Sequence, residues 1–374
     1  MRELNMIRTG YSTLMTLLFL AVLAGCAALP EKHLGIDGSS DQRWSREKAN
    51  EWYDQLPWLV GVNFLPSTAI NQLEMWQESS FDPETIDREL GWAADFGVNT
   101  VRVYLHDLAW EADSEGFLER IDTFLSIADK HGIKPNFVFF DDCWNPTAEI
   151  GEQPAPIPGV HNSGWVQSPV ASVKDQPENW GRLETYVTGV VSRFANDDRI
   201  LYWDVYNEPG NTGREEKSLP LLQKAFAWVR AGNPSQPVTA GIWNWSEGFE
   251  LLNAYQKMHS DIITFHQYND LAAMERSIHE MQGMGRPVIC TEWMARTNNS
   301  LVESHLPLLK QEKVGAINWG LVSGKSNTIF PWGSEPGSPE PELWFHDLLH
   351  RDGSPYKQSE IDIFKTLTED NPTY

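Results

Sequence analysis

The sequence predicts a (β/α)8 TIM barrel as the fold of its main domain. Short runs rich in β-branched and aromatic residues alternate eight times with amphipathic stretches, over roughly 310 residues, which is the size of an ordinary barrel with insertions. The runs are almost continuously apolar, as expected for parallel strands that are buried on both faces. A doubly wound open sheet is the alternative, but the glycine-rich phosphate turn that it would show after an early strand is absent.

The predicted strands begin with the run LVGVNF and end with the run GAINWGLV. They cover residues 59–64, 100–105, 134–140, 200–206, 237–243, 261–268, 287–293 and 315–322. The helical patterns between them cover residues 82–97, 116–132, 179–194, 216–230, 272–284 and 301–311. The first of these begins with Asp82 as a capping residue and has Pro83 just inside, which is typical of a helix N-terminus.

The first residues have the layout of an export signal. Arg2 and Arg8 precede a short apolar run that ends at Leu23, and the run is too short to be a comfortable membrane span. The stretch LAGC, ending at Cys26, resembles the lipobox of bacterial lipoproteins, in which the cysteine is lipidated and becomes the first residue of the mature chain. A plain secretory signal with an incidental cysteine is the alternative. By the same resemblance, Ala27 favours the outer membrane, with the protein periplasmic or on the cell surface.

The sequence therefore divides into a signal peptide (1–25), a polar tether (26–48) and one barrel domain (49–370). The formal net charge of −23 opposes binding to nucleic acid or to an anionic lipid surface and is compatible with a neutral substrate. After Cys26 only Cys143 and Cys290 remain, which excludes a disulfide framework and favours two buried thiols. A single disulfide between them, in an oxidising compartment, is the alternative.

Two loops stand out for their length and composition. The segment from Asp141 to Glu178 follows the third predicted strand and is rich in Pro, Gly, Trp and His. A second polar loop, residues 323–342, follows the eighth strand. In a barrel both belong to the face that carries active sites, and such long connections tend to be functional. If the first loop walls off one side of the central pit, short ligands are expected there, whereas an open cleft favours polymers.

Two carboxylates follow distant strands of the predicted barrel. Glu208 ends the fourth strand within YNEP, and Glu292 ends the seventh within TEW. Because the carboxyl ends of barrel strands face one pit, these two acids are expected to meet there. Hydrolysis of a glycosidic bond requires such a pair, since one carboxyl protonates the leaving oxygen while the other stays charged.

The residues beside Glu208 are expected to shape its surroundings. Asn207 offers a side-chain donor for a sugar hydroxyl, and Pro209 is expected to hold Glu208 in an extended conformation and to end the strand. Neighbouring strand residues point to opposite faces, so Asn207 and Glu208 share the pit only if the strand bulges or terminates between them.

The order of these motifs resembles the retaining glycoside hydrolases of clan A, and most closely glycoside hydrolase family 5, the cellulase and β-mannanase family. The resemblance spans residues 59 to about 322 and implies a nucleophile at Glu292 and an acid/base at Glu208. It further implies substrate-site roles for residues near the strand ends, namely Arg102 on the second strand, Asn207, the pair His266 and Tyr268 in FHQY, and Trp319 in INWG. The histidine that family members commonly carry near the end of strand three is missing from FFDDCWN. Either His106 or His161 substitutes for it, or its role is absent here.

Aromatic residues gather at the predicted strand ends. The sequence has 17 tryptophans, and flat aromatic faces with polar rims suit sugar rings. Candidate sugar-stacking residues are Trp144, Trp165, Trp293 and Trp319, and Trp243, Trp245 and Trp332 also lie at or beyond strand ends. For any one of them a purely structural role is the alternative. Trp52, Trp92 and Trp228 lie in helical patterns and are expected in the core.

The remaining polar candidates have alternative roles. Arg102 could pair with Asp204 as well as with Glu292, and Asp141 and Asp142 are expected to cap the long loop rather than to form a second acid pair or a metal site. No His-x-His motif occurs among the ten histidines, so a bound catalytic metal is not expected, nor is any other cofactor.

The sequence thus predicts a monomeric, lipid-anchored retaining glycoside hydrolase that cleaves β-linked glycans such as β-glucan or mannan. Two alternatives remain open on the sequence alone. One is a glycan-binding lipoprotein without catalytic activity, for which an intact acid pair would be unnecessary. The other is a transglycosylase, or a phosphate-dependent lyase, acting on the same sugars.

Overall fold

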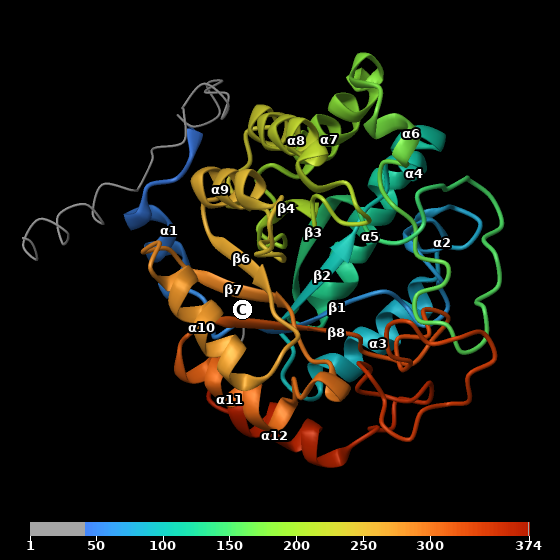
Figure 1. The fold of residues 1–374 in the computed structure, drawn as a ribbon, viewed down its shortest axis with the longest axis vertical. Coiled ribbons are helices and arrows are strands. Elements are labelled where there is room, and N and C mark those ends of the chain that lie inside the picture. The colour runs from blue at the N-terminus through green and yellow to red at the C-terminus, as the bar shows by residue number, and fades with distance from the viewer. Residues whose placement is uncertain (1–41, 373) are drawn as a thin grey trace, which may run out of the picture. The chain divides into compact units, whose positions relative to one another are not determined.

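The computed structural model describes residues 42–372 and Tyr374, and these form a barrel of parallel strands surrounded by helices (Figure 1). Neighbouring strands pair in the order β5-β4-β3-β2-β1-β8-β7-β6, and an isolated parallel bridge between Ile242 and Phe265 links the two ends of this series. The strands are β1 (Val60–Asn63), β2 (Thr100–Tyr104), β3 (Lys134–Asp141), β4 (Trp203–Asn207), β5 (Val238–Thr239), β6 (Ile263–His266), β7 (Val288–Glu292) and β8 (Gly315–Trp319). The predicted (β/α)8 barrel is confirmed, and each strand overlaps its predicted range, with β3 and β4 ending one residue later.

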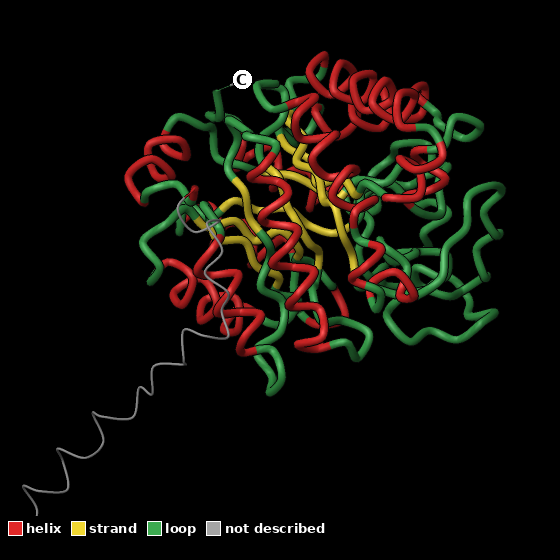
Figure 2. The backbone as a smooth tube through the Cα atoms, turned by 90° about the horizontal axis from the view of Figure 1, so that it is seen from above, coloured by secondary structure: helices red, strands yellow, loops and turns green. Residues whose placement is uncertain are grey.

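Helices cover the outside of the barrel (Figure 2), and all six predicted helices are present. Asp82 caps the first predicted one by accepting a hydrogen bond from the backbone N–H of Thr85. The described helices are α1 (Arg46–Asp54), α2 (Gln72–Trp76), α3 (Pro83–Ala94), α4 (Asp107–Ala112), α5 (Ser114–Lys130), α6 (Ala171–Lys174), α7 (Gly181–Phe194), α8 (Leu219–Ala231), α9 (Glu250–His259), α10 (Leu271–Gln282), α11 (Val302–Gln311) and α12 (Gln358–Thr368). Short 3-10 turns lie at Pro177–Asn179, Glu215–Ser218 and Arg296–Asn298. Within the described residues, no helix is both long and apolar enough to cross a membrane.

The start of the domain differs from the expected tether. The signal peptide, Cys26 and most of the tether lie outside the described residues. Residues 43–48, however, pack on the barrel: Trp44 is buried and its backbone N–H donates to Asp261, and Arg43 donates to the carbonyls of Lys257 and Ser260. The polar composition of this stretch does not predict its packing on the barrel, because most of the contacts involve backbone groups.

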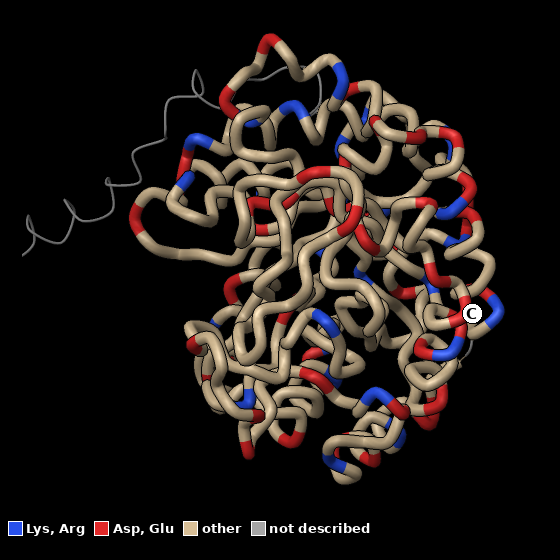
Figure 3. The backbone as a smooth tube through the Cα atoms, turned by 90° about the vertical axis from the view of Figure 1, so that its right-hand side faces the viewer, with Lys and Arg blue, Asp and Glu red and all other residues tan. Residues whose placement is uncertain are grey.

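The two long loops lie at the carboxyl ends of the strands and contact each other, as the green and orange-red traces of Figure 1 show. Cys143 and Cys290 are both buried free thiols, which confirms that prediction. In the view of Figure 3, Lys and Arg positions are scattered among Asp and Glu rather than gathered into a basic surface. This distribution agrees with the acidic charge of the whole sequence.

Candidate active site

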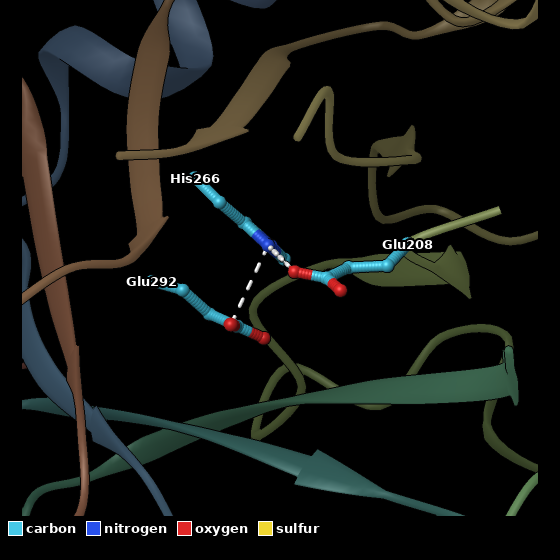
Figure 4. A group of neighbouring side chains, drawn as sticks. All are labelled: Glu208, His266 and Glu292. Carbon is cyan, nitrogen blue, oxygen red and sulfur yellow. Dashed lines mark hydrogen bonds and ion pairs between the residues drawn. The ribbon is translucent and has the colours of Figure 1, made fainter. Parts of the chain in front are cut away.

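Glu208 and Glu292 face each other at the mouth of the barrel (Figure 4). Strand β4 ends at Asn207, directly before Glu208, and β7 ends with Glu292. One carboxylate oxygen of each residue and a ring nitrogen of His266 all lie within 4.8 Å of one another. Two carboxylates separated by about 5 Å leave room for a sugar carbon between them but not for an additional water molecule.

Glu208 reaches the pit because its backbone leaves the strand conformation. Its φ angle of +44° is in the left-handed region, so the expected extended conformation is wrong. The clash with the ring of Pro209 disfavours the right-handed helical region, and the Glu208 carbonyl accepts a hydrogen bond from the backbone N–H of Asn211. The strand terminates between Asn207 and Glu208, and both side chains line the same cavity. Such a backbone costs about 1–3 kcal/mol, which the surrounding contacts must offset.

Glu292 is buried and accepts three hydrogen bonds. Arg102 Nη1 and the Tyr104 hydroxyl donate to Oε1, each at 2.8 Å, and the Tyr268 hydroxyl donates to Oε2 at 2.8 Å. Burial, together with the nearby charge of Glu292, raises the pKa of both tyrosines well above its ordinary value. Both hydroxyls therefore keep their protons and remain donors to the carboxylate.

Arg102 is fully buried and serves both functions that were considered for it. Its Nε and Nη2 donate to Asp204 Oδ2, at 3.0 and 2.9 Å, while Nη1 donates to Glu292. The same guanidinium donates to the side-chain oxygens of Asn63 and Asn207. Because these partners lie on β1, β4 and β7, Arg102 fixes Glu292 relative to strands on the other side of the barrel.

Glu208 is held by three donors on its two oxygens. His266 Nδ1 lies 2.9 Å from Oε1 and also 3.4 Å from Glu292 Oε2, so the ring bridges the two acids. The Cys143 thiol lies 3.1 Å from Oε2, and the Asn211 amide donates to the same oxygen. Burial favours the neutral acid, but the hydrogen bonds and charge from His266, with the other two donors, outweigh it and hold the pKa of Glu208 below its ordinary value.

Asn207 is oriented from both ends of its amide. Its oxygen accepts from Arg102, and its nitrogen donates to Asp141 Oδ1 at 3.0 Å. Asp141 also accepts from the Trp165 indole and the backbone N–H of Cys143. Burial raises the pKa of Asp141 to about 6.

Asp142 contacts the long loop and residues on and after β4, and it contacts neither Glu208 nor Glu292. It accepts hydrogen bonds from Lys174, Tyr206, Ser218 and the backbone N–H of Gly210. Asp142 thus joins the long loop to β4 and the segment after it, whereas Asp141 holds Trp165 and Cys143 of the loop and also orients Asn207.

A cavity of about 1020 Å³ opens above the two acids. Its polar lining includes asparagines from several loops, and its apolar lining is dominated by aromatic rings. The tryptophans that line it are Trp144, Trp165, Trp243, Trp245, Trp319 and Trp332, of which Trp144, Trp245 and Trp332 are each about 40% exposed or more (39%, 41% and 45%). Broad apolar faces beside polar groups are what a sugar-binding cavity needs.

Trp293 does not belong to this cavity, contrary to the prediction. It is fully buried and stacks on His305 of α11, with ring centroids 6.2 Å apart. Its neighbour Glu292 faces the pit, and because adjacent strand residues point to opposite faces, Trp293 points outward to the helices.

Several residues of the site were not anticipated. Tyr104 is predictable from the sequence, because it lies two positions after Arg102 and therefore on the same face of the strand. No sequence pattern predicts the contacts of Cys143 and Asn211, because loop geometry brings these residues to Glu208. Of the two histidines considered as substitutes, His161 lines the cavity, whereas His106 is buried at the start of α4 and bonds Gln167.

Glu208, His266 and Glu292 also have the donor spacing of a metal site. Their oxygens, however, already accept hydrogen bonds from Tyr268, Arg102 and other donors. The guanidinium of Arg102 at 2.8 Å from Glu292 would repel a cation. The arrangement suits two carboxylates that act on a neutral ligand better than a metal.

Comparison with known proteins agrees with this geometry. The profile of the family described as Cellulase (glycosyl hydrolase family 5) matches residues 68–325. Mannan endo-1,4-beta-mannosidase A of Emericella nidulans is 24% identical over 54% of this chain and 53% of its own length, and a probable mannan endo-1,4-beta-mannosidase A of Aspergillus oryzae is 24% identical over 72% and 70%. This chain thus spans about half the length of the first relative.

The fold also resembles solved structures. The structure of GH5_18 from Streptomyces cattleya in complex with GlcNAc superposes with a TM-score of 0.59 over 85% of this chain and 82% of that one, at 14% identity. A likeness at this identity establishes a shared barrel fold. The family profile, which covers more than half of the sequence, identifies the chain as a member of glycosyl hydrolase family 5.

Proposed function

We propose that this protein is a retaining glycoside hydrolase that cleaves β-linked glycans by double displacement. The observation that carries the proposal is the pair of carboxylates, Glu208 and Glu292, with oxygens within 4.8 Å of each other in an aromatic-lined cavity. Membership of family 5 supports the same reaction class. A non-catalytic glycan-binding protein would have no need for both acids in this geometry.

In the first step an oxygen of Glu292 bonds to the anomeric carbon while the glycosidic bond breaks. The departing oxygen takes the proton of Glu208 and leaves as an alcohol. In the second step Glu208 takes a proton from water, whose oxygen attacks the anomeric carbon and releases Glu292 as a carboxylate. Arg102, Tyr104 and Tyr268 donate hydrogen bonds that hold Glu292 in position before the attack.

The change in charge of Glu292 helps Glu208 to serve as acid and then as base. In the free site three donors hold the pKa of Glu208 below its ordinary value. A bound sugar displaces water from the cavity, and this desolvation, with the negative charge of Glu292, favours the protonated form. Once Glu292 is esterified its charge is lost, the pKa of Glu208 falls again, and the carboxylate can accept the proton of water.

We propose a neutral β-glycan of the mannan or glucan type as the substrate. The acidic sequence, with a net charge of −23, suits an uncharged ligand. The names of the fungal relatives, which are mannan endo-1,4-beta-mannosidases, support β-1,4-mannan as the first substrate to test.

The test is hydrolysis of an aryl β-glycoside and of β-linked oligosaccharides by the wild type and by two variants. Glu292→Gln is expected to abolish turnover while the protein still folds and unfolds cooperatively, whereas Glu208→Gln is expected to retain most of its first step on the aryl substrate, whose leaving group needs little protonation. The exposed Glu303→Gln in α11 serves as a control for loss of charge. Full activity of Glu292→Gln would exclude the proposed nucleophile.

We further propose that the protein is exported as a monomer and held on a bacterial membrane, with the outer membrane expected, through lipids on Cys26. Support comes from the LAGC stretch and the short apolar run before it. Two or more acyl chains on one residue give a stable anchor, since a single chain binds only marginally. Labelled palmitate is expected to enter the wild type and not Cys26→Ser, and the variant is expected in the soluble fraction; equal labelling of both would exclude this anchor.

A further inference from the structure

One side of the barrel mouth is closed by a wall of interlocked loops. We define the wall as residues 157–166 of the loop after β3 and residues 323–338 of the loop after β8. The backbone N–H of Asn162 donates to Ser326 O at 2.8 Å, that of Gly337 donates to Pro158 O at 2.7 Å, and His161 Nδ1 lies 2.7 Å from Phe330 O. The two loops are also packed closely, since a Cβ atom placed on Gly159 would lie 2.5 Å from the backbone nitrogen of Ser338.

The wall is joined to the loop after β1 as well. Asn71 and Gln72 donate from their side-chain amides to the carbonyls of Gly164 and Val166. On the other half of the wall, the backbone N–H of Lys325 donates to Ser67 O and its ammonium group pairs with Glu74. The wall therefore spans the mouth over β8, β1 and β3 as one hydrogen-bonded unit.

The cavity ends where the wall meets two aromatic rings. Trp165 and Trp319 line the large cavity of about 1020 Å³ and also a second cavity behind it of about 20 Å³. Their ring centroids are 5.5 Å apart, and both rings pack on Tyr104. A volume of 20 Å³ holds about one water molecule and no sugar ring. Of the described residues in the loops after β1 and β2 (64–77 and 105–113), none lines the large cavity.

The closed end lies on the side of Glu292. Tyr104, against which Trp165 and Trp319 pack, donates to Glu292 Oε1, and Trp332 of the wall packs on Tyr268, which donates to Oε2, with ring centroids 5.0 Å apart. On the side of Glu208 the lining continues through Asn211, Thr212 and the loop Trp243–Trp245 after β5. Trp245 is 41% exposed there, beyond the acids and outside the wall.

We infer that the enzyme acts on chain ends: the non-reducing end of a β-glycan docks against the Trp165–Trp319 pair, and a unit of one or two sugars is released. This inference rests on the proposed function, in which Glu292 attacks the last retained sugar and Glu208 protonates the departing chain. The sugar attacked by Glu292 lies on the closed side, so the chain cannot continue far in that direction. The departing chain runs past Glu208 toward Trp245.

The experiment uses pentaoses of β-linked mannose, glucose, xylose and galactose that carry a fluorescent tag at the reducing end. The wild type is expected to shorten at least one of them stepwise from the untagged end, so that tagged products appear in order of decreasing length while the released sugar keeps one size. On the corresponding polymer, reducing ends should appear with little early loss of viscosity. Glu292→Gln serves as the blank.

A variant that opens the wall provides a second measurement. Gly159→Ala introduces a Cβ atom against Ser338 at a residue with φ of +80° and is expected to part the loops, which should permit longer released products and faster loss of polymer viscosity. Gly132→Ala, at φ of +68° with no atom within 4 Å of the new Cβ, carries the same backbone strain outside the wall and is expected to keep the wild-type product size.

The outcomes separate the two proposals. Internal cleavage from the first time points, or removal of units from the tagged end, in reactions that Glu292→Gln abolishes, would overturn the inference and leave the proposed function intact. If the wild type hydrolyses neither the four pentaoses nor an aryl β-glycoside, the proposed function is overturned, and this inference with it.

Discussion

The Sγ atom of Cys143 lies 3.1 Å from Oε2 of Glu208, so a buried thiol contacts the proposed acid/base directly. The cysteine belongs to the loop after β3 and comes within reach because Asp141 accepts a hydrogen bond from its backbone N–H. Burial raises the pKa of the Cys143 thiol well above its ordinary value. The group therefore keeps its proton and acts as a donor to the carboxylate, not as a thiolate.

Cys143→Ala is expected to shift the pH profile of the enzyme. A hydrogen bond to a carboxylate lowers its pKa, so loss of the thiol donor should raise the pKa of Glu208 and move the basic limb of kcat/KM to higher pH. Cys143→Ser keeps a donor and should restore most of the wild-type profile. In contrast, Cys290→Ser changes a buried thiol on β7 and is expected to leave this limb in place; the same shift in both serine variants would argue against a specific contact.

The hydroxyl of Tyr268 is expected to contribute to the chemical step. Tyr268→Phe removes one of the three donors to Glu292, and a hydrogen bond to a charged group is worth about 1.5–3 kcal/mol, so kcat should fall by roughly 10- to 150-fold. The ring remains, and KM should change little. Tyr186→Phe is the matched control, because this buried hydroxyl has no hydrogen-bond partner in the described chain. A Tyr268→Phe enzyme with wild-type kcat would exclude the role.

The barrel was predictable because its strands carry the strongest pattern that a sequence offers. Strands such as TVRVYL are buried on both faces, so most of their residues are apolar whichever face they point to. The two acids followed from their places at strand ends. Helix α9 (Glu250–His259) was missed because its mixed polar sequence directly follows an irregular loop, and α1 was hidden within a polar stretch.

The details of the site depended on backbone turns that residue patterns do not encode. The rule for a residue before proline indicated an extended Glu208, yet its left-handed φ is what turns the carboxylate into the pit. The predicted sugar contact of Trp293 is wrong because strand alternation points this ring away from the pit that Glu292 faces. Cys143 and Asn211 reach Glu208 through loops, where contact cannot be predicted from spacing.

Replacing Arg102 is expected to damage both folding and catalysis. Arg102→Ala leaves the fully buried Asp204 without its partner, and breaking a buried ion pair from one side costs about 3–5 kcal/mol. The free energy of unfolding in urea should fall by this amount and recover in part in the double variant with Asp204→Asn, whereas activity should remain low in both because Glu292 has lost a donor.

A buried ion pair away from the pit supplies the control for Arg102. Arg230 pairs with Asp261 at 2.7 Å, and Arg230→Ala should lower the stability in a similar way. Assayed well below its unfolding temperature, this variant should keep the kcat/KM of the wild type. If Arg102→Ala lost activity only in proportion to its unfolded fraction, the guanidinium would be a structural group alone.

Glu89, which lies outside the catalytic site, is expected to make the stability of the fold depend on pH. It is fully buried on α3, where it accepts hydrogen bonds from Ser67, and burial raises its pKa from 4.5 to about 7. Between these values the folded state binds more protons than the unfolded state, so stability is present below about pH 4.5 and is lost as the pH rises to 7. At 1.36 kcal/mol per unit the loss approaches about 3 kcal/mol.

The variant Glu89→Gln cannot ionise and isolates this contribution. The free energy of unfolding of the wild type, measured relative to Glu89→Gln, should fall from pH 4.5 to pH 7 and then stay constant, because the buried carboxyl is charged in both states above that range. Glu84→Gln, an exposed position of the same helix, controls for the loss of one negative charge. A difference that stays flat or grows with pH would mean that the Glu89 carboxyl is charged throughout and that Ser67 and neighbouring groups offset its burial.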